Sequence, residues 1–245
     1  MMTRKIREHI SWKCASWLEM KSSFYMIEKA PFQLCMTPEA LQTMLSSVGS
    51  KPPETGAKGF GPVEFLGIDT IEPEPSSHTG FGAVYAPDTE WGDKTLEYHR
   101  LRNKLWTTDI HSHPGNLGTP SWKSGKGLGD LGYVEEVFKQ NETMLFFFIP
   151  ILTGTLTAEV TIWPWVCKRG EKDEPILMFA DLCICPPSCF PVRPFNPKWE
   201  QQVEDAKNTA EKNKRTPPKP SQPTPLPTRR EERKHYYGDF DSYFL

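Results

Sequence analysis

The 245-residue chain lacks the long apolar run that a membrane-spanning helix requires. Its longest uninterrupted apolar stretch, Met144–Leu152, has nine residues, whereas a helix needs roughly 20 to cross a bilayer. Polar and charged residues also follow the basic N-terminus, so no signal-peptide apolar segment forms before Lys21. We therefore expect a cytoplasmic protein without a membrane span.

Cysteine and net charge are also scarce. Six cysteines are too few and too unevenly spaced for a disulfide-stapled secreted scaffold, so we expect reduced thiols. The 29 lysines and arginines nearly balance the 31 aspartates and glutamates. No global field would therefore hold the chain on nucleic acid or on an anionic membrane, and we expect neither as a partner.

Composition divides the chain into four regions. Residues 1–30 mix charges with scattered aromatics and show no clear period, so the structure of this N-terminal extension stays open. Residues 31–195 carry the apolar segments and form the predicted domain. Residues 196–214 carry a narrow apolar stripe, which predicts an amphipathic helix. Residues 215–245 begin with a proline-rich stretch that favours a flexible linker, and an aromatic C-terminal tail follows.

Helices and strands alternate within the predicted domain. The succession Thr37-Pro38-Glu39 provides a capping residue, a proline at the first helical position and an early acid, which together indicate a helix start. We expect helices at 38–47, at 88–104 with Asp88 as cap, and from Asp130 onward, and strands at 107–110, 144–152 and 156–166. This order predicts an α/β (α+β) fold with a mixed β-sheet flanked by helices.

The segment Thr107–Asp130 carries the clearest chemical signal. His111 and His113 follow a short β-branched and apolar strand, and if the strand frays there, both imidazoles can turn towards one point. Catalytic zinc usually takes three protein ligands and leaves a fourth position to water. Asp130, at the start of a predicted helix, is the natural third ligand. A bare His-x-His is a weak signal, and ordinary strand-end histidines are the alternative.

Residues around these histidines resemble a known metallopeptidase signature. His-Ser-His-Pro is followed by Ser121, with seven residues between His113 and this serine, which is similar to the motif of the JAB/JAMM (MPN-domain) family. Glu54 stands in Pro-Pro-Glu-Thr-Gly, which looks like the Glu-Thr-Gly opening of the bacterial branch. An Ala-x-Tyr-Ala-Pro-Asp stretch at 83–88 has the expected place in the order, and the resemblance covers about residues 37–166.

The resemblance implies an MPN/JAB-like fold and a zinc-dependent peptidase or isopeptidase. His111, His113 and Asp130 would bind Zn²⁺, Glu54 would serve as general base and acid, and Ser121 would donate a hydrogen bond to the developing oxyanion. The implied partners are a ubiquitin-like protein or its conjugates, and activating or conjugating enzymes of the same system. The alternatives are a catalytically inactive scaffold that binds a ubiquitin-like protein, and the processing of a small sulfur-carrier protein.

The sequence departs from the family pattern at the aspartate. With two residues in between, the family has Asp after the serine of the motif, whereas this chain has Ser124 after Ser121. Either an insertion between Lys123 and Gly129 leaves Asp130 as the ligand, or the metal site is incomplete. We favour the insertion, because Asp130 starts a predicted helix as the family's aspartate does.

Two further choices stay open at this point. Glu64 is an alternative base, although the Thr-Gly that follows Glu54 favours Glu54. Cys183, Cys185 and Cys189 could hold a second metal, but their spacing is not that of a zinc ribbon and no histidine lies close in sequence. Packed thiols are the favoured interpretation.

Overall fold

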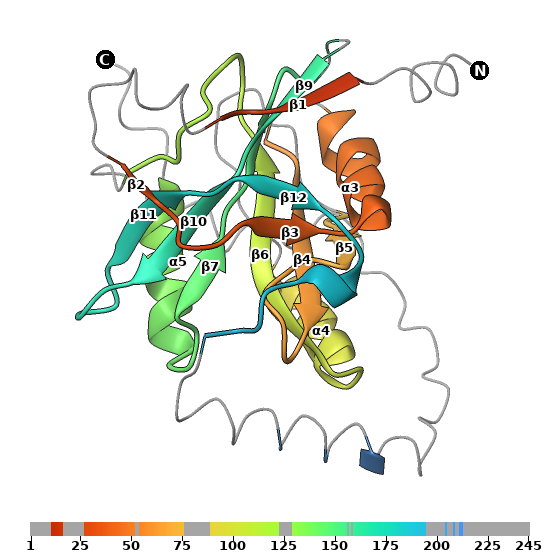
Figure 1. The fold of residues 1–245 in the computed structure, drawn as a ribbon, viewed down its shortest axis with the longest axis vertical. Coiled ribbons are helices and arrows are strands. Elements are labelled where there is room, and N and C mark those ends of the chain that lie inside the picture. Colours follow the sequence, from red (N-terminus) through yellow and green to blue (C-terminus); the bar gives the residue numbers. More distant parts are fainter. Residues whose placement is uncertain are drawn as a thin grey trace, which may run out of the picture.

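The centre of the protein is a ten-stranded mixed sheet (Figure 1). The computed structural model describes residues 11–16, 27–51, 54–75, 89–122, 129–155, 157, 159–194 and four helical positions at 204, 208, 211 and 212. Most of the predicted 196–214 helix and the whole 215–245 tail therefore lie outside the described residues. Within the described part, no helix is long and apolar enough to cross a bilayer.

Hydrogen bonds order the strands of this sheet. The order is β1 (Ser11–Cys14), β9 (Glu159–Trp163), β8 (Ile151–Thr153), β6 (Lys104–Ser112), β7 (Phe146–Phe148), β10 (Trp165–Arg169), β11 (Pro175–Phe179) and β2 (Glu28–Lys29). On its other edge β6 pairs with β4 (Gly56–Pro62), which pairs with β5 (Thr70–Pro73). A separate parallel pair joins β3 (Leu34–Met36) to β12 (Leu182–Ile184). The N-terminal region, left open above, thus supplies two strands of the large sheet.

Helices flank the sheet, as the predicted class requires. They are α3 (Pro38–Met44), which continues as the π-helix η1 (Leu45–Gly49), α4 (Thr89–Arg100) and α5 (Gly129–Gln140), with a short 3₁₀ helix η2 (Pro187–Cys189) near the end of the described chain. The side chain of Thr37 accepts a hydrogen bond from the Ala40 N–H, so the predicted cap of α3 is confirmed. The apolar face predicted for the third helix is buried in α5.

The two faces of the sheet pack into two hydrophobic clusters. Successive side chains of a strand point to opposite faces, and in β7 Phe147 packs with α5 whereas Phe148 packs with the cluster that contains α3 and β3. Ile151 and Leu152 of β8 alternate in the same way. These strands are buried on both faces, which explains why their sequences read as continuous apolar runs.

Prolines divide the two long strands that the sequence predicted. The expected strand 144–152 is two strands, β7 and β8, interrupted before Ile151 at Pro150, and the expected strand 156–166 becomes β9 and β10 on either side of Pro164. Proline has no N–H to donate to a strand ladder. The breaks lie opposite each other, so β7 pairs with β10 while β8 pairs with β9.

Two predicted element boundaries are also wrong. The helix predicted over 88–104 ends at Arg100, and the chain turns at Asn103, whose φ of 60° lies in the left-handed region that asparagine tolerates. The strand predicted over 107–110 spans Lys104–Ser112 because β4 pairs with β6 from Lys104 to His111. Asp88, the proposed cap of this helix, lies outside the described residues.

A buried ion pair between two strands of the sheet also holds α5. Lys58 on β4 donates to both carboxylate oxygens of Asp109 on β6 at 3.1 Å, and each side chain is only 5% exposed. The Tyr133 hydroxyl of α5 donates to the same carboxylate at 2.5 Å, and the Trp106 indole N–H donates at 2.9 Å. The Asp109 carboxylate therefore accepts hydrogen bonds from three side chains, which offset the cost of burying its charge.

We expect Lys58→Met to lower the free energy of unfolding by about 3–5 kcal/mol, because it leaves the carboxylate of Asp109 buried without its cation. The matched control is Lys94→Met, which removes a lysine from an exposed pair with Glu90 on α4 and should have little effect. Urea unfolding of the two variants measures the difference. Equal losses in both would show that the buried pair does not support the fold.

Candidate metal centre

Strand β6 carries the first histidine into the centre of the sheet. His111 is paired with Gly56 of β4 on one side and with Ile151 of β8 on the other. The strand therefore continues past His111 without fraying, and the imidazoles meet although the strand end stays paired. His113 follows the strand end, and its N–H still donates to the Leu152 carbonyl at 2.9 Å. Both imidazoles are consequently held by backbone pairing, with their Nε2 atoms 2.9 Å apart.

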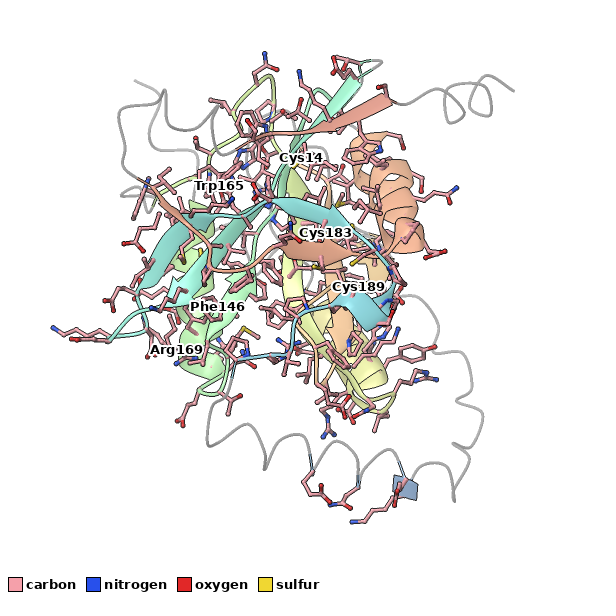
Figure 2. All side chains as sticks on the ribbon, in the orientation of Figure 1. Cys14, Phe146, Trp165, Arg169, Cys183 and Cys189 are labelled. Carbon is pink, nitrogen blue, oxygen red and sulfur yellow. The ribbon has the colours of Figure 1, made fainter. Side chains whose placement is uncertain are left out.

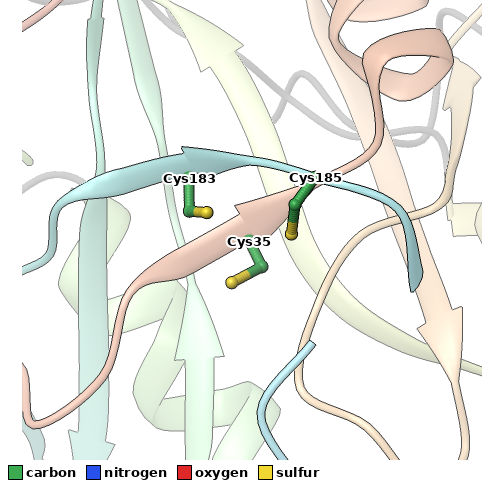
Figure 3. Close-up of side chains that lie close together, drawn as sticks. All are labelled: Cys35, Cys183 and Cys185. Atoms are coloured by element: carbon green, nitrogen blue, oxygen red, sulfur yellow. The ribbon is translucent and has the colours of Figure 1, made fainter. Parts of the chain in front are cut away.

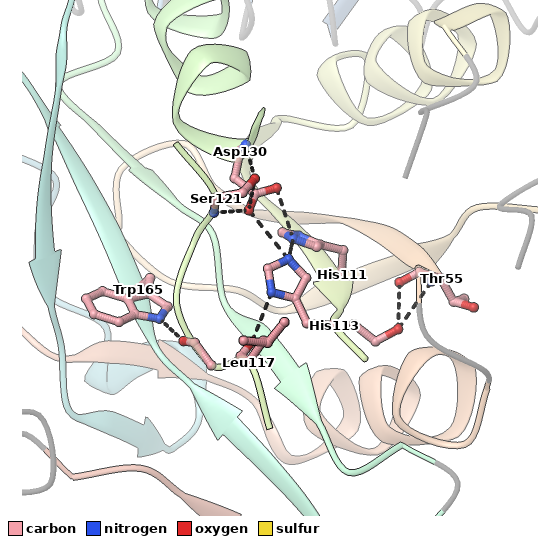
Figure 4. Close-up of polar contacts among 9 residues, drawn as sticks. Thr55, His111, His113, Leu117, Ser121, Asp130 and Trp165 are labelled. Carbon is pink, nitrogen blue, oxygen red and sulfur yellow. Dashed lines mark hydrogen bonds and ion pairs between the residues drawn. The ribbon is translucent and has the colours of Figure 1, made fainter. Parts of the chain in front are cut away.

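Asp130 completes a three-residue cluster with these histidines. Its Oδ1 lies 3.2 Å from Nε2 of His111, and its Oδ2 lies 3.5 Å from Nε2 of His113 (Figure 4). A tetrahedral zinc ion with bonds of about 2.0–2.1 Å to nitrogen and oxygen separates its ligand atoms by about 3.3 Å. The three observed distances lie near that value, but the two to Asp130 join different carboxylate oxygens, so a zinc ion bound through one of them requires the carboxylate to rotate.

Ser121 fixes the position of the Asp130 carboxylate. Its backbone N–H and its hydroxyl both donate to Oδ2, at 2.6 and 2.9 Å, and its Oγ in turn accepts from the Asp130 N–H at 2.9 Å. Ser121 thus caps the start of α5 from across the segment 123–128. That segment, with Ser124, lies outside the described residues.

A glycine permits the turn into α5. Gly129 has a φ of +60°, and a Cβ there would lie 2.7 Å from the Trp122 carbonyl oxygen. Both features exclude larger side chains at this position. The structure therefore brings Asp130 to the two histidines despite its displacement in sequence, which is the geometry that the insertion hypothesis requires.

The tautomer of His113 is set by the loop that follows. Its Nδ1 lies 2.9 Å from the Leu117 carbonyl oxygen, so Nδ1 carries the proton and the neutral ring keeps its Nε2 lone pair for a ligand. A second hydrogen bond of this kind is typical of metal-binding histidines. The loop itself is anchored by the Trp165 indole N–H, which donates to the Gly118 carbonyl at 2.5 Å (Figure 4).

The charges of the cluster favour a cation. Burial opposes ionisation of Asp130, but hydrogen bonds from His111 and His113 hold the pKa of its carboxyl well below its usual range. Burial also opposes the charged form of His113, yet the hydrogen bond and the charge of Asp130 raise the pKa of His113. Protons and a metal ion therefore compete for the same nitrogen.

Glu54 lies two residues before the start of β4, next to the strand end that carries the histidines. The Glu54 N–H donates to the Ser112 carbonyl at 2.9 Å, and the residue is only 8% exposed. Its negative charge also raises the pKa of His113. Its φ of 65° is unusual for a residue with a side chain, and such backbone outliers cluster at functional sites.

Glu64, the alternative base, is at the wrong end of β4. It follows Pro62, which pairs with Lys104, whereas Gly56 pairs with His111 at the other end. Seven residues of strand separate these ends by about 20 Å. The structure therefore contradicts Glu64 as a base for this cluster.

Sequence reasoning missed Ser112, the residue between the two histidines. Its hydroxyl accepts a hydrogen bond from the Thr55 N–H at 3.2 Å, and its own N–H donates to the Thr55 carbonyl at 3.0 Å. Alternation along a strand was the available signal, because it directs Ser112 away from the face that its neighbours occupy. Ser112 thereby joins the segment that carries Glu54 to the segment that carries the imidazoles.

Comparisons with known proteins do not assign this cluster. The chain matches no family model and no curated protein. A solution structure of a Desulfitobacterium hafniense protein is 13% identical with a TM-score of 0.43, covering 62% of this chain and 93% of that one. A solution structure of a Salinibacter ruber protein is 12% identical with a TM-score of 0.39, covering 66% and 97%. These TM-scores are too low to assign a fold family or a function.

We expect Asp130→Ala to lower bound zinc by about one ion per chain, because three protein ligands are the usual minimum for such a site. His113→Ala should have the same effect, and Ser124→Ala should leave the zinc content unchanged. Elemental analysis of the dialysed proteins measures the difference. Zinc loss in Ser124→Ala with retention in Asp130→Ala would contradict the insertion hypothesis.

Proposed function

We propose that this chain is a zinc-dependent peptidase or isopeptidase of the JAB/JAMM type, which cleaves ubiquitin-like modifiers from conjugates or precursors. The observation that carries the proposal is the convergence of His111, His113 and Asp130, with a buried Glu54 whose backbone is hydrogen-bonded to the residue between the two histidines. Structural zinc sites are usually closed by four protein ligands, whereas catalytic sites keep one position open. The described residues of this cluster offer three protein ligands.

The bound ion would supply a water of lowered pKa and would polarise the scissile carbonyl. Glu54 takes a proton from the attacking water and returns it to the leaving amine, which is the work of a general base and acid. The Glu54 backbone N–H is bonded to β6, so the carboxylate starts from a fixed anchor.

Ser121 has two roles in this proposal. Its hydroxyl donates to Asp130 here, and it must turn towards substrate to donate to a developing oxyanion. Its backbone N–H keeps its own hydrogen bond to Asp130. The ligand can therefore stay in place while the hydroxyl changes partner.

Exposed apolar side chains lie in the segment between the second and third metal ligands. Leu117 is 62% exposed and Trp122 is 68% exposed. Each is close in sequence to a residue of the cluster, and exposed apolar groups beside a site are suited to binding a peptide. A polypeptide substrate is therefore favoured over a small polar molecule.

We expect Glu54→Gln to keep its zinc and its melting temperature but to lose about 10²–10⁴-fold in kcat/KM on a ubiquitin-like fusion, because the amide cannot transfer a proton. Glu64→Gln is the matched control and should retain full activity. Cleavage assays on the zinc-loaded proteins measure both. Full activity in Glu54→Gln would remove Glu54 from the mechanism.

The alternatives predict a different result for the unmodified protein. A binding scaffold would hold zinc and a ubiquitin-like protein yet cleave neither a linear fusion nor a lysine-linked conjugate. A sulfur-carrier processing enzyme would cleave only the precursor of a small carrier protein. Testing all three substrates with the same zinc-loaded preparation separates these functions.

A further inference from the structure

Three cysteines form a second cluster on the small parallel sheet. Cys35 lies on β3, Cys183 lies on β12, and Cys185 follows directly after β12 (Figure 3). Their sulfur atoms all lie within 4.8 Å of one another. The described ligands of the first cluster are two histidines and an aspartate, so the two clusters share no residue.

Strand pairing brings these thiols together. Cys183 and Cys35 are direct partners in the parallel register. Cys185 is two residues further on, and alternate residues of an extended chain point to the same face. The Cys185 N–H donates to the Met36 carbonyl at 3.0 Å, so the chain is still held against β3 at that point.

The thiols are placed where a metal can both reach them and be held. Cys35 is 3% exposed, whereas Cys183 and Cys185 are partly exposed. Burial and the neighbouring thiols raise the pKa of Cys35 to about 12, and burial and Cys183 raise the pKa of Cys185 to about 11. Three thiolates within 4.8 Å of one another would repel, and a cation between them offsets this repulsion.

We propose that Cys35, Cys183 and Cys185 bind one zinc ion, which joins β3 to β12. Thiolates favour soft metals such as zinc. Zinc–sulfur bonds of about 2.3 Å place tetrahedral sulfurs about 3.8 Å apart, so small side-chain rotations suffice here. A structural zinc usually has a fourth protein ligand, and Cys189 in η2 is the next thiol along the chain.

The site has a structural consequence. It links a strand near the beginning of the domain to the last strand of the described chain. A metal that binds the folded chain and not the unfolded one stabilises the fold. The role of this zinc is therefore to hold the ends of the domain together, separately from any reaction at the first cluster.

Cobalt(II) provides a test that distinguishes the two clusters, because only thiolates give a sulfur-to-cobalt charge-transfer absorption in the near ultraviolet. We expect this absorption when the reduced, metal-free full chain is titrated with Co²⁺, and its displacement by Zn²⁺. It should be lost in Cys183→Ser and strongly weakened in Cys185→Ser. Both residues are partly exposed, so these variants should still fold.

Cys14→Ser is the matched control. Cys14 is also partly exposed but lies on β1, apart from Cys183 and Cys189 (Figure 2), so this variant should keep the absorption. Zinc should raise the melting temperature of Asp130→Ala, and Cys183→Ser added to it should abolish that rise. Absence of the charge-transfer absorption in the reduced protein would overturn the proposal, as would its survival in Cys183→Ser. A disulfide that forms among these thiols in place of metal binding, detected by mass, would also overturn it.

Discussion

Pairing of β6 along both edges is the constraint on which the rest of the structure depends. β4 follows one edge from Lys104 to His111, and β7 and β8 follow the other. A strand paired on both sides cannot shift its register without turning its side chains to the opposite face. Asp109 is therefore fixed towards Lys58, and His111 is fixed at the end of the strand where the candidate metal centre lies.

The position of Asp130, the candidate third ligand, depends on α5, and this helix is held at both ends. Ser121 binds the first turn of α5, and Arg169 donates to the Phe138 carbonyl at 2.5 Å and to the Asn141 carbonyl at the other end. Cationic donors satisfy the free carbonyls of a helix C-terminus. Because β10 carries Arg169, the position of Asp130 is tied to the same sheet that holds the histidines.

Structural features that depend on a few adjacent residues could be predicted from the sequence. The cap at Thr37, the buried face of α5 and the class of the fold depend on local patterns, and the structure confirms them. The strand breaks at Pro150 and Pro164 could not be placed from hydrophobicity, because both sides of each break are equally apolar. Only pairing with different neighbours shows that they are separate strands.

The same distinction applies to the two clusters. The first could be predicted because His111, His113 and Asp130 lie in one segment, whereas Ser112 was missed because its partner Thr55 is far away in the sequence. The cysteine cluster was not predicted, since nothing local connects Cys35 to Cys183. Packed thiols were favoured because no histidine lies close to these cysteines in sequence. Only the pairing of β3 with β12 brings Cys35 beside Cys183.

At Glu54, strand pairing holds a strained backbone and a buried carboxylate in the same residue. A left-handed conformation costs a residue with a side chain of order 1–3 kcal/mol, and here four hydrogen bonds with Ser112 hold the Glu54–Thr55 segment on β6. A glycine would adopt this conformation without strain. The chain instead places a carboxylate there, buried and close enough to raise the pKa of His113. Stability alone does not favour that choice, whereas the proton transfer proposed for Glu54 would need a carboxylate at this position.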